Sequence, residues 1–246
     1  MSGAMTSPTD STGQMRLPLR RGLSGQEEAF VVSASNAAAH QALMTWPTPL
    51  GGTAALCGPA GSGKSHLARV WAERVGALPF DGMEIALADP LELEGRPLLL
   101  DSAATVDDET LFHLMNLAQA PGGALLLVSR DLPGRWPVDL PDLRSRLNGL
   151  LVLTLEAPDD AVLAAMFRAR FAERSLQPAE DVIAYLIRRV DRSADSVERV
   201  VELLDGAHAP VKRVLARRVL DESGDLFAPE CDRSLRLSLP RSRTAS

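Results

Sequence analysis

The residues best suited to chemistry form one run, Gly58 to Ser65, which reads Gly-Pro-Ala-Gly-Ser-Gly-Lys-Ser. This is a complete P-loop, whose glycines let backbone N–H groups approach a phosphate closely. A helix starting near Lys64 would point the positive end of its dipole at the same place. Lys64 could bridge the β- and γ-phosphates, and the Ser65 hydroxyl could ligate magnesium. A chance glycine-rich turn is disfavoured because the run lies between a predicted strand and a predicted helix.

The expected cofactors are therefore ADP or ATP with Mg²⁺. The candidate nucleotide-binding residues of this stretch are Gly58, Pro59, Ala60, Gly61, Ser62, Gly63, Lys64, Ser65 and the following His66. Magnesium needs a second anchor, usually an Asp at the end of a buried strand. Asp101 follows three leucines and is the candidate, so Ser65 and Asp101 form the predicted Mg²⁺ site.

Two further positions bear on hydrolysis. Many hydrolytic P-loop proteins place a carboxylate after the strand-end Asp to orient the attacking water, but this chain has Ser102 there. Slow or absent intrinsic hydrolysis is therefore expected. Ser129 ends another apolar run and could sense the γ-phosphate through a hydrogen bond, although an ordinary strand-end turn explains it equally well.

The elements that must position these residues alternate between strand-like and helical patterns. Strands are predicted from short apolar runs, and helices from apolar residues three and four apart. The runs are Thr53–Cys57, Met83–Leu87, Pro97–Leu100, Ala124–Val128 and Leu150–Leu155, and the helical patterns are Asn36–Met44, Ser65–Val75 and Asp107–Gln119. This alternation predicts an α/β fold with a five-stranded parallel sheet and helices on both faces.

The pattern changes after Pro158, where helical segments alone remain. They are Asp159–Ser175, Pro178–Val190, Ala194–Ala207 and Pro210–Glu222. We therefore predict an α/β nucleotide-binding domain at 28–157 and a small all-helical lid at 158–222. Polar, small-residue composition predicts disordered tails at 1–27 and 223–246.

Composition narrows the remaining classes. The net charge of −6 argues against a generally basic surface that coats nucleic acid. Two cysteines are too few for a disulfide framework. No apolar stretch approaches a membrane span, and no secretory signal is read. A cytoplasmic protein is expected, with a transit peptide as the weaker alternative suggested by Arg16, Arg20 and Arg21.

Several of these segments, taken in order, resemble a known family. Phe30–Asn36, the P-loop followed by His66 and Leu67, Asp101, and Leu143–Leu147 are similar to the AAA+ core of the bacterial replication initiator DnaA. The helical lid fits the same pattern, so the resemblance covers roughly residues 28–222. It implies an AAA+ P-loop NTPase fold. The chain ends where a DNA-binding domain would begin in DnaA, an organisation that resembles the Hda branch of the DnaA-related family.

The resemblance also implies a role for each end of the chain. Arg146 looks like the arginine finger that AAA+ proteins insert into a neighbour's nucleotide site. The N-terminal residues Gln14, Met15, Leu17, Pro18 and Leu19 are similar to the peptide by which Hda docks on the replicative sliding clamp, the β subunit of DNA polymerase III.

The implied function is regulatory inactivation of DnaA, in which a clamp-recruited protein triggers hydrolysis of the ATP bound to DnaA. The implied partners are DnaA, the clamp and, through the clamp, DNA; no membrane is involved, and a homo-oligomer is left open. The lid arginine that senses nucleotide in AAA+ proteins would fall near Asp195, so Arg192, one helical turn earlier, is the candidate replacement.

Two alternatives remain open. A small-molecule kinase also uses this P-loop pattern, but the lid segment shows no glycine-hinged flap. A DnaA-related helicase loader would be consistent with a basic stretch on the last helix, namely Lys212, Arg213, Arg217 and Arg218. A solvated helix face explains that stretch as well, given the acidic total.

Overall fold

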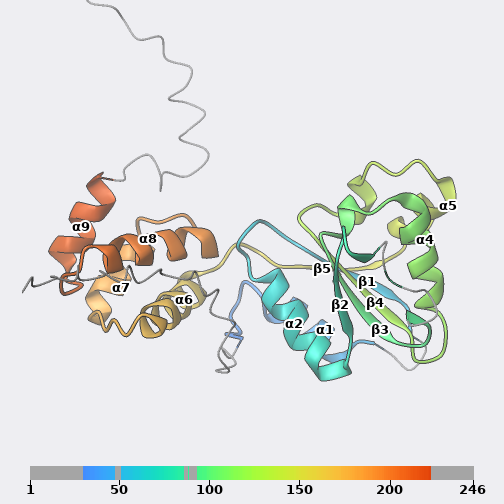
Figure 1. Cartoon of the computed structure of the whole chain (residues 1–246), viewed down its shortest axis with the longest axis horizontal. Helices are drawn as coiled ribbons and strands as arrows, with labels where there is room; N and C mark the ends of the chain where they lie inside the picture. Colours follow the sequence, from blue (N-terminus) through green and yellow to red (C-terminus); the bar gives the residue numbers. More distant parts are fainter. Residues whose placement is uncertain (1–29, 48–50, 86–87, 89–92, 223–246) are drawn as a thin grey trace, which may run out of the picture.

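The computed structural model describes residues 30–47, 51–85, 88 and 93–222 (Figure 1). The predicted clamp-binding peptide, Gln14 to Leu19, lies outside the described residues. The predicted tails therefore receive no structural account, apart from residues 28–47, of which 30–47 are described.

Within the described residues, five parallel strands form a single sheet in the order β2-β3-β4-β1-β5. The strands are β1 (Thr53–Cys57), β2 (Leu78–Asp81), β3 (Pro97–Asp101), β4 (Ala124–Ser129) and β5 (Leu151–Thr154). The predicted five-stranded parallel sheet is thus confirmed.

The second strand was predicted at the wrong place. It runs from Leu78 to Asp81 rather than over Met83–Leu87, because Asp81 ends it in a turn. The Asp81 carbonyl accepts a hydrogen bond from the Glu84 N–H at 3.0 Å, and its carboxylate accepts one from the Met83 N–H at 3.2 Å. The apolar residues that follow serve other purposes: Ile85 plugs the core from this turn, whereas Met83 is exposed.

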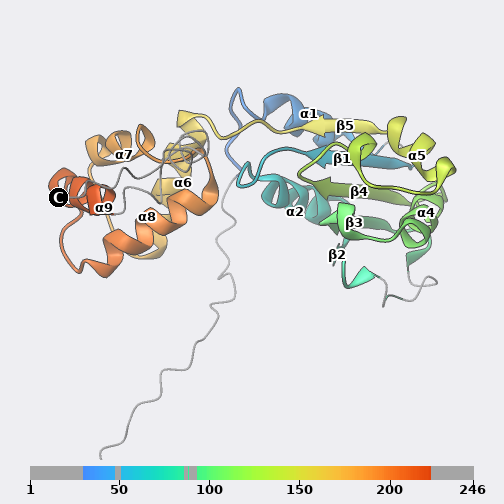
Figure 2. The same ribbon diagram turned by 90° about the horizontal axis from the view of Figure 1, so that it is seen from above.

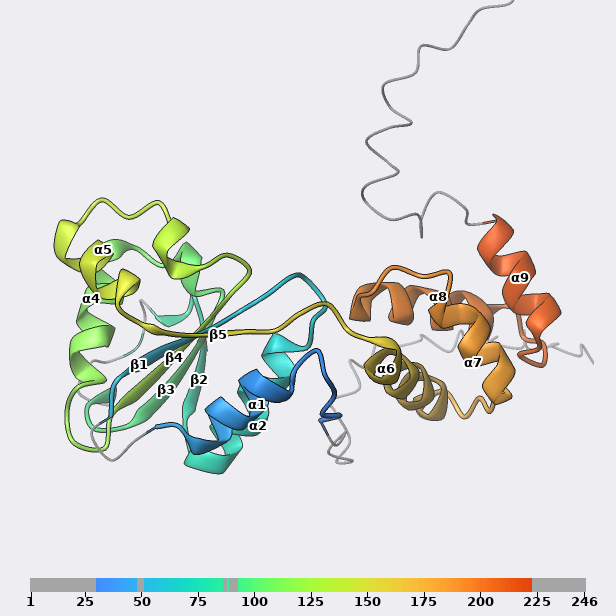
Figure 3. The same cartoon turned by 180° about the vertical axis from the view of Figure 1, so that it is seen from behind.

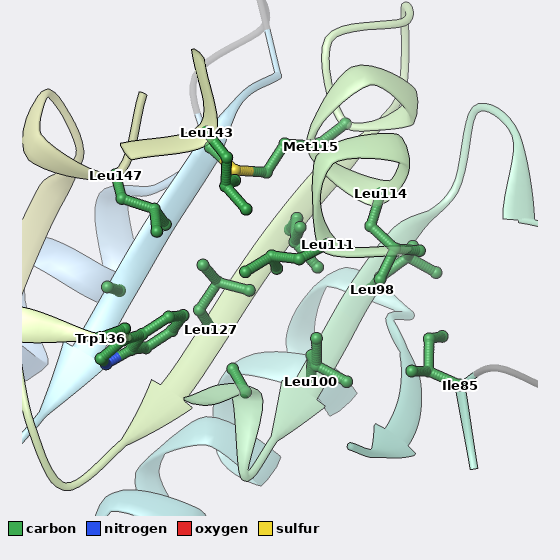
Figure 4. Close-up of a cluster of buried hydrophobic side chains, with 14 of the residues drawn as sticks. Ile85, Leu98, Leu100, Leu111, Leu114, Met115, Leu127, Trp136, Leu143 and Leu147 are labelled. Carbon is green, nitrogen blue, oxygen red and sulfur yellow. The ribbon is translucent and has the colours of Figure 1, made fainter. Parts of the chain in front are cut away.

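Alternate side chains of the strands face two separate clusters, as the period of two in a strand requires. On one face, Leu125 and Leu127 of β4 pack with residues of α4 (Asp108–Leu117) and α5 (Pro141–Asn148) (Figure 4). On the other, Leu126 and Val128 pack with α1 (Ala37–Thr45) and α2 (Lys64–Val75). Helices therefore cover both faces, as Figure 2 shows.

After β5 the chain forms four helices with a cluster of their own. They are α6 (Asp160–Glu173), α7 (Glu180–Ile187), α8 (Ala194–Gly206) and α9 (Arg213–Glu222). Phe167 and Phe171 of α6 stack with ring centroids 6.0 Å apart at the centre of this cluster. Figure 3 shows the four helices gathered apart from the sheet. This separate core supports the predicted division near Pro158, which stays a prediction.

No helix in the described part of the chain is long and apolar enough to cross a membrane. Asp107 caps α4, as the sequence predicted, through a 2.9 Å hydrogen bond from the Thr110 N–H to its carboxylate. The segment around Arg144 and Arg146, expected on a loop, is instead the short helix α5 with Pro141 in its first turn, a position proline favours.

The buried central strand should dominate stability. Leu126→Ala, at a residue with 0% exposure, is expected to lower the free energy of unfolding by about 2–5 kcal/mol, because it leaves a cavity in β4. Denaturant unfolding followed by circular dichroism measures the change. Leu151→Ala is the matched control, since this β5 leucine is 48% exposed and should cost under about 1 kcal/mol. Equal losses in the two variants would contradict the assignment of the core.

Candidate nucleotide site

The candidate P-loop joins the carboxyl end of β1 to the first turn of α2. Gly58 has a φ of 153°. A Cβ on this residue would lie 2.4 Å from the Leu155 carbonyl oxygen. Only glycine fits this close approach between the loop and the segment after β5. The loop backbone is therefore held at the carboxyl edge of the sheet, where open α/β sheets bind ligands.

Ser65 and Asp101, predicted from distant parts of the sequence, lie together. The Ser65 hydroxyl donates to a carboxylate oxygen of Asp101 at 2.7 Å. The other oxygen of Asp101 accepts from the Ser102 N–H at 2.8 Å. A hydroxyl beside a carboxylate at the end of a P-loop is the donor set that Mg²⁺ takes in P-loop proteins. These two residues fit the ion, which would neutralise phosphate charge there.

Lys64 lies inside the loop rather than on its surface. It is buried, and its ammonium group donates to the Pro59 carbonyl at 2.6 Å. Burial lowers the pKa of Lys64, and the positive charge of Arg130 lowers it further. The ammonium group is thus held within the loop, close to where a phosphate would lie.

Ser62 supplies an independent sign that the loop fits a phosphate. Its hydroxyl is buried and has no hydrogen-bond partner among the described residues. Leaving a buried hydroxyl unpaired costs about 1–3 kcal/mol. A phosphate oxygen in the loop would accept this hydrogen bond, so the residues present fit a nucleotide.

Ser129 and Ser102 occupy neighbouring strand ends. The Ser129 hydroxyl donates to the Asp131 carbonyl at 2.6 Å and lies 3.5 Å from the Cys57 sulfur. This hydroxyl therefore closes the turn after β4, and its role as a γ-phosphate sensor stays a prediction. Ser102 has a φ of 54° and begins the turn after β3, without a carboxylate to orient water.

The lid touches the P-loop directly. The Ala194 N–H, at the start of α8, donates to the Gly61 carbonyl at 3.3 Å. A Cβ on Gly61 would lie 2.7 Å from that nitrogen and 2.7 Å from the Ser193 Cβ. The φ of Gly61 is 68°, a left-handed conformation. The loop and the lid therefore pack so closely that position 61 has no room for a side chain.

Arg192 contacts the connection between the sheet and the lid. Its guanidinium pairs with Asp160 at 2.6 Å and donates to the Pro158 carbonyl at 3.1 Å. The next two residues, Ser193 and Ala194, are those that meet Gly61. Arg192 thus holds the lid loop at the hinge, and its predicted contact with nucleotide stays a prediction.

A hollow of about 560 Å³ lies beside this hinge. It is lined by Ala34, Ser35, Glu156, Ala157, Pro158, Asp159, Asp160, Ala161 and Arg192. Of these residues, the sequence assigned only Arg192 to the site. The others come from the segment before α1 and from the hinge, and the capping Asp159 was the one local signal among them.

Asp159 connects three parts of this region. Its carboxylate caps α6 by accepting the Val162 N–H at 3.0 Å. This bond holds the pKa of Asp159 below its ordinary value, and the Ser33 hydroxyl contributes a smaller lowering. Asp159 therefore links the segment before α1 to the first turn of the lid.

Arg146 lies far from its own P-loop in the fold. It belongs to α5, which leads into the amino end of β5, whereas the P-loop follows the carboxyl end of β1. Since β1 and β5 are parallel and paired, the two sites lie at opposite ends of the sheet. The Arg146 guanidinium donates to the Asn116 side-chain oxygen at 2.6 Å and lies 4.4 Å from the centre of the Phe112 ring.

Known proteins share this arrangement. The chain is similar to DnaA domain III of Thermotoga maritima, with a TM-score of 0.66 and 20% identity over 82% of this chain and 97% of that one. It is also similar to AMPPCP-bound DnaA of Aquifex aeolicus, with a TM-score of 0.60 and 18% identity over 81% of this chain and 69% of that one. The described chain has a DnaA-like AAA+ fold.

The DnaA-like fold agrees with a sequence match. The chain is 33% identical over 125 residues to the chromosomal replication initiator DnaA of Thermomicrobium roseum. That match takes in 49% of this chain and 26% of the initiator, so the chain spans about a quarter of the curated relative. The chain matches no protein-family model.

The lid–loop contact predicts that Gly61→Ala weakens nucleotide binding at least about 10-fold. The new Cβ must displace Ser193 and Ala194 from the P-loop. Titration with a fluorescent ADP analogue measures the Kd. Gly76→Ala is the matched control, because Gly76 has a φ of 70° with no atom within 4 Å of the added Cβ. Both variants bear the left-handed penalty of about 1–2 kcal/mol. A normal Kd for Gly61→Ala would contradict the contact.

Asp159 should make stability depend on pH. Because its pKa is lowered in the folded protein, its contribution is fully present above the unfolded pKa of about 4. It is lost as the pH falls through the lower folded value. Asp159→Ala is expected to cost about 1 kcal/mol at pH 7, the usual value of a lost cap. Unfolding measured between pH 7 and pH 3 should show this difference shrink; a constant difference would contradict it.

Proposed function

We propose that this chain is a nucleotide-bound regulator that acts on ATP held by a DnaA-type initiator. The observation that carries the proposal is the position of Arg146, at the opposite end of the sheet from a complete P-loop. An arginine there cannot serve its own nucleotide. In an AAA+ pair, the same position can face the nucleotide site of a neighbouring molecule.

The chemistry assigned to Arg146 is stabilisation of charge in the transition state. As phosphoryl transfer proceeds, negative charge spreads over the oxygens of the γ-phosphate, and a guanidinium supplied in trans neutralises it. Such a finger is worth about 10³–10⁵-fold in rate. Arginine suits the task because it stays charged and presents paired N–H donors in a fixed plane.

The chain's own nucleotide has a different role in this proposal. Ser102 occupies the position where a water-orienting acid is expected, so the bound nucleotide should turn over slowly. The P-loop also touches the lid through Gly61 and Ala194. Bound ADP or ATP, held with Mg²⁺ by Ser65 and Asp101, would therefore act on the position of the lid, as a structural switch.

Recruitment is assigned to the N-terminal peptide Gln14 to Leu19. Leu17 and Leu19 offer apolar side chains, Pro18 restricts the backbone, and Gln14 can hydrogen-bond at the rim of a pocket. We propose that this peptide binds the sliding clamp and that DNA is met through the clamp. Similarity to replication initiators in fold and sequence supports a place in replication control. The helicase-loader alternative shares the fold but does not require Arg146.

The central experiment measures ATP hydrolysis by DnaA in the presence of clamp loaded on DNA. Wild-type protein is expected to raise the rate. Arg146→Ala should remove the stimulation by about 100-fold or more, because the trans charge is lost. Arg146→Lys should recover little, since an ammonium group lacks the planar pair of donors.

Two control variants separate the steps. Arg69→Ala removes an exposed arginine from α2, on the other face of the sheet, and should stimulate normally. A Gln14/Leu17/Leu19 alanine variant should raise the protein concentration needed for half-maximal stimulation and leave the maximal rate unchanged. Stimulation by Arg146→Ala equal to that by wild type would show that the finger assignment is wrong.

A further inference from the structure

Helix α5, which bears Arg146, begins without a cap of its own. Its N-cap residue is Leu140, whose side chain has no oxygen to accept a hydrogen bond. A helix start leaves backbone N–H groups without partners inside the helix. The two N–H groups that lead into α5, those of Asp139 and Leu140, are nevertheless bonded, and their partner comes from another helix.

That partner is Asp108. One oxygen of its carboxylate accepts the Asp139 N–H at 2.7 Å and the Leu140 N–H at 2.9 Å. The residue before it, Asp107, already caps α4 through Thr110. Two adjacent aspartates thus have separate tasks: Asp107 closes its own helix, and Asp108 holds the entrance of α5.

The two helices are joined at three levels. At the far end of α5, Arg146 reaches Asn116 and the Phe112 ring of α4. Between the ends, Leu143 and Leu147 are buried in the same cluster as Leu111, Leu114 and Met115, and Figure 4 shows the side chains of Leu143 and Met115 side by side. Asp108 is the polar contact that fixes the amino end of this pair.

We propose that Asp108 is a positioning residue that sets the direction of Arg146 by fixing the entrance of α5; this rests on the function proposed above. Six residues separate Leu140 from Arg146, about 9 Å along a helix. Releasing the entrance lets α5 pivot on its buried leucines. A displacement of about 1 Å in a catalytic group can cost about 100-fold in rate. Asp108 would therefore act on the chemical step without touching the nucleotide.

The test compares Asp108→Ala with Asp107→Ala in the DnaA hydrolysis assay. Asp108→Ala is expected to lower the maximal stimulated rate about 10-fold, while the concentration for half-maximal stimulation changes less than about twofold. Asp107→Ala, which loses only the cap of α4, should keep a near-normal maximal rate. Asp108→Asn should recover most of the rate, since the amide oxygen can accept both N–H groups.

Hydrogen exchange on the same full-length variants adds a readout without DnaA. Asp108→Ala should speed amide exchange at Asp139 and Leu140 about 10-fold or more, whereas Asp107→Ala should speed it at Thr110. Slow exchange at Asp139 and Leu140 in Asp108→Ala overturns the proposal. So does an equal loss of maximal rate and half-maximal concentration, which would indicate general destabilisation.

The outcomes also separate this inference from the proposed function. A normal maximal rate for Asp108→Ala, with Arg146→Ala inactive, overturns the positioning role and leaves the finger in place. Absence of stimulation by wild type overturns the proposed function and, with it, any catalytic effect of Asp108. In that case, exchange at Asp139 and Leu140 still decides whether Asp108 fixes α5.

Discussion

The pairing of β5 with β1 in parallel is the constraint on which the rest depends. Register from Ala54 opposite Leu151 to Cys57 opposite Thr154 makes the two strands start and end together. The P-loop leaves the carboxyl end of β1, and α5 enters the amino end of β5. One structural choice therefore separates the candidate nucleotide site from Arg146, and the proposal of action in trans follows from that separation.

The same sheet edge that holds the P-loop also receives the lid. Gly61 meets Ala194, and the Asp160–Arg192 pair ties the lid loop to the hinge. Asp159 joins the hinge to the segment before α1. A nucleotide in the P-loop would lie next to these contacts, so its presence would bear on the position of the lid. This is the physical content of a structural switch in the proposed function.

Local patterns in the sequence predicted much of this arrangement. The P-loop run, the Asp107 cap and the apolar runs of β1, β3 and β4 are each encoded within a few residues, and each was placed correctly. The parallel order of strands then brought Ser65 beside Asp101, as an Asp at a strand end implies. Features of this kind need no knowledge of distant contacts.

The remaining features depend on partners remote in sequence. Strand β2 was misplaced because its Pro79 and Asp81 resemble turn residues, while pairing with β3 decides the strand. Asp108 looks like a second cap of α4 until the approach of residues 139 and 140 is known. Arg192 looked like a nucleotide contact, yet Asp160 and Pro158 are its partners here. A single sequence does not encode which of several acceptors a long side chain will meet.

The central claim is that hydrolysis takes place in the partner's P-loop and not in this one. Single-turnover experiments with labelled nucleotide test it most directly. DnaA is loaded with labelled ATP and this chain with unlabelled ADP, and the labels are then exchanged between the two proteins. The account predicts rapid conversion of the label when DnaA carries labelled ATP, and little conversion of labelled ATP on this chain. Rapid turnover of ATP on this chain, with that on DnaA unchanged, would contradict it.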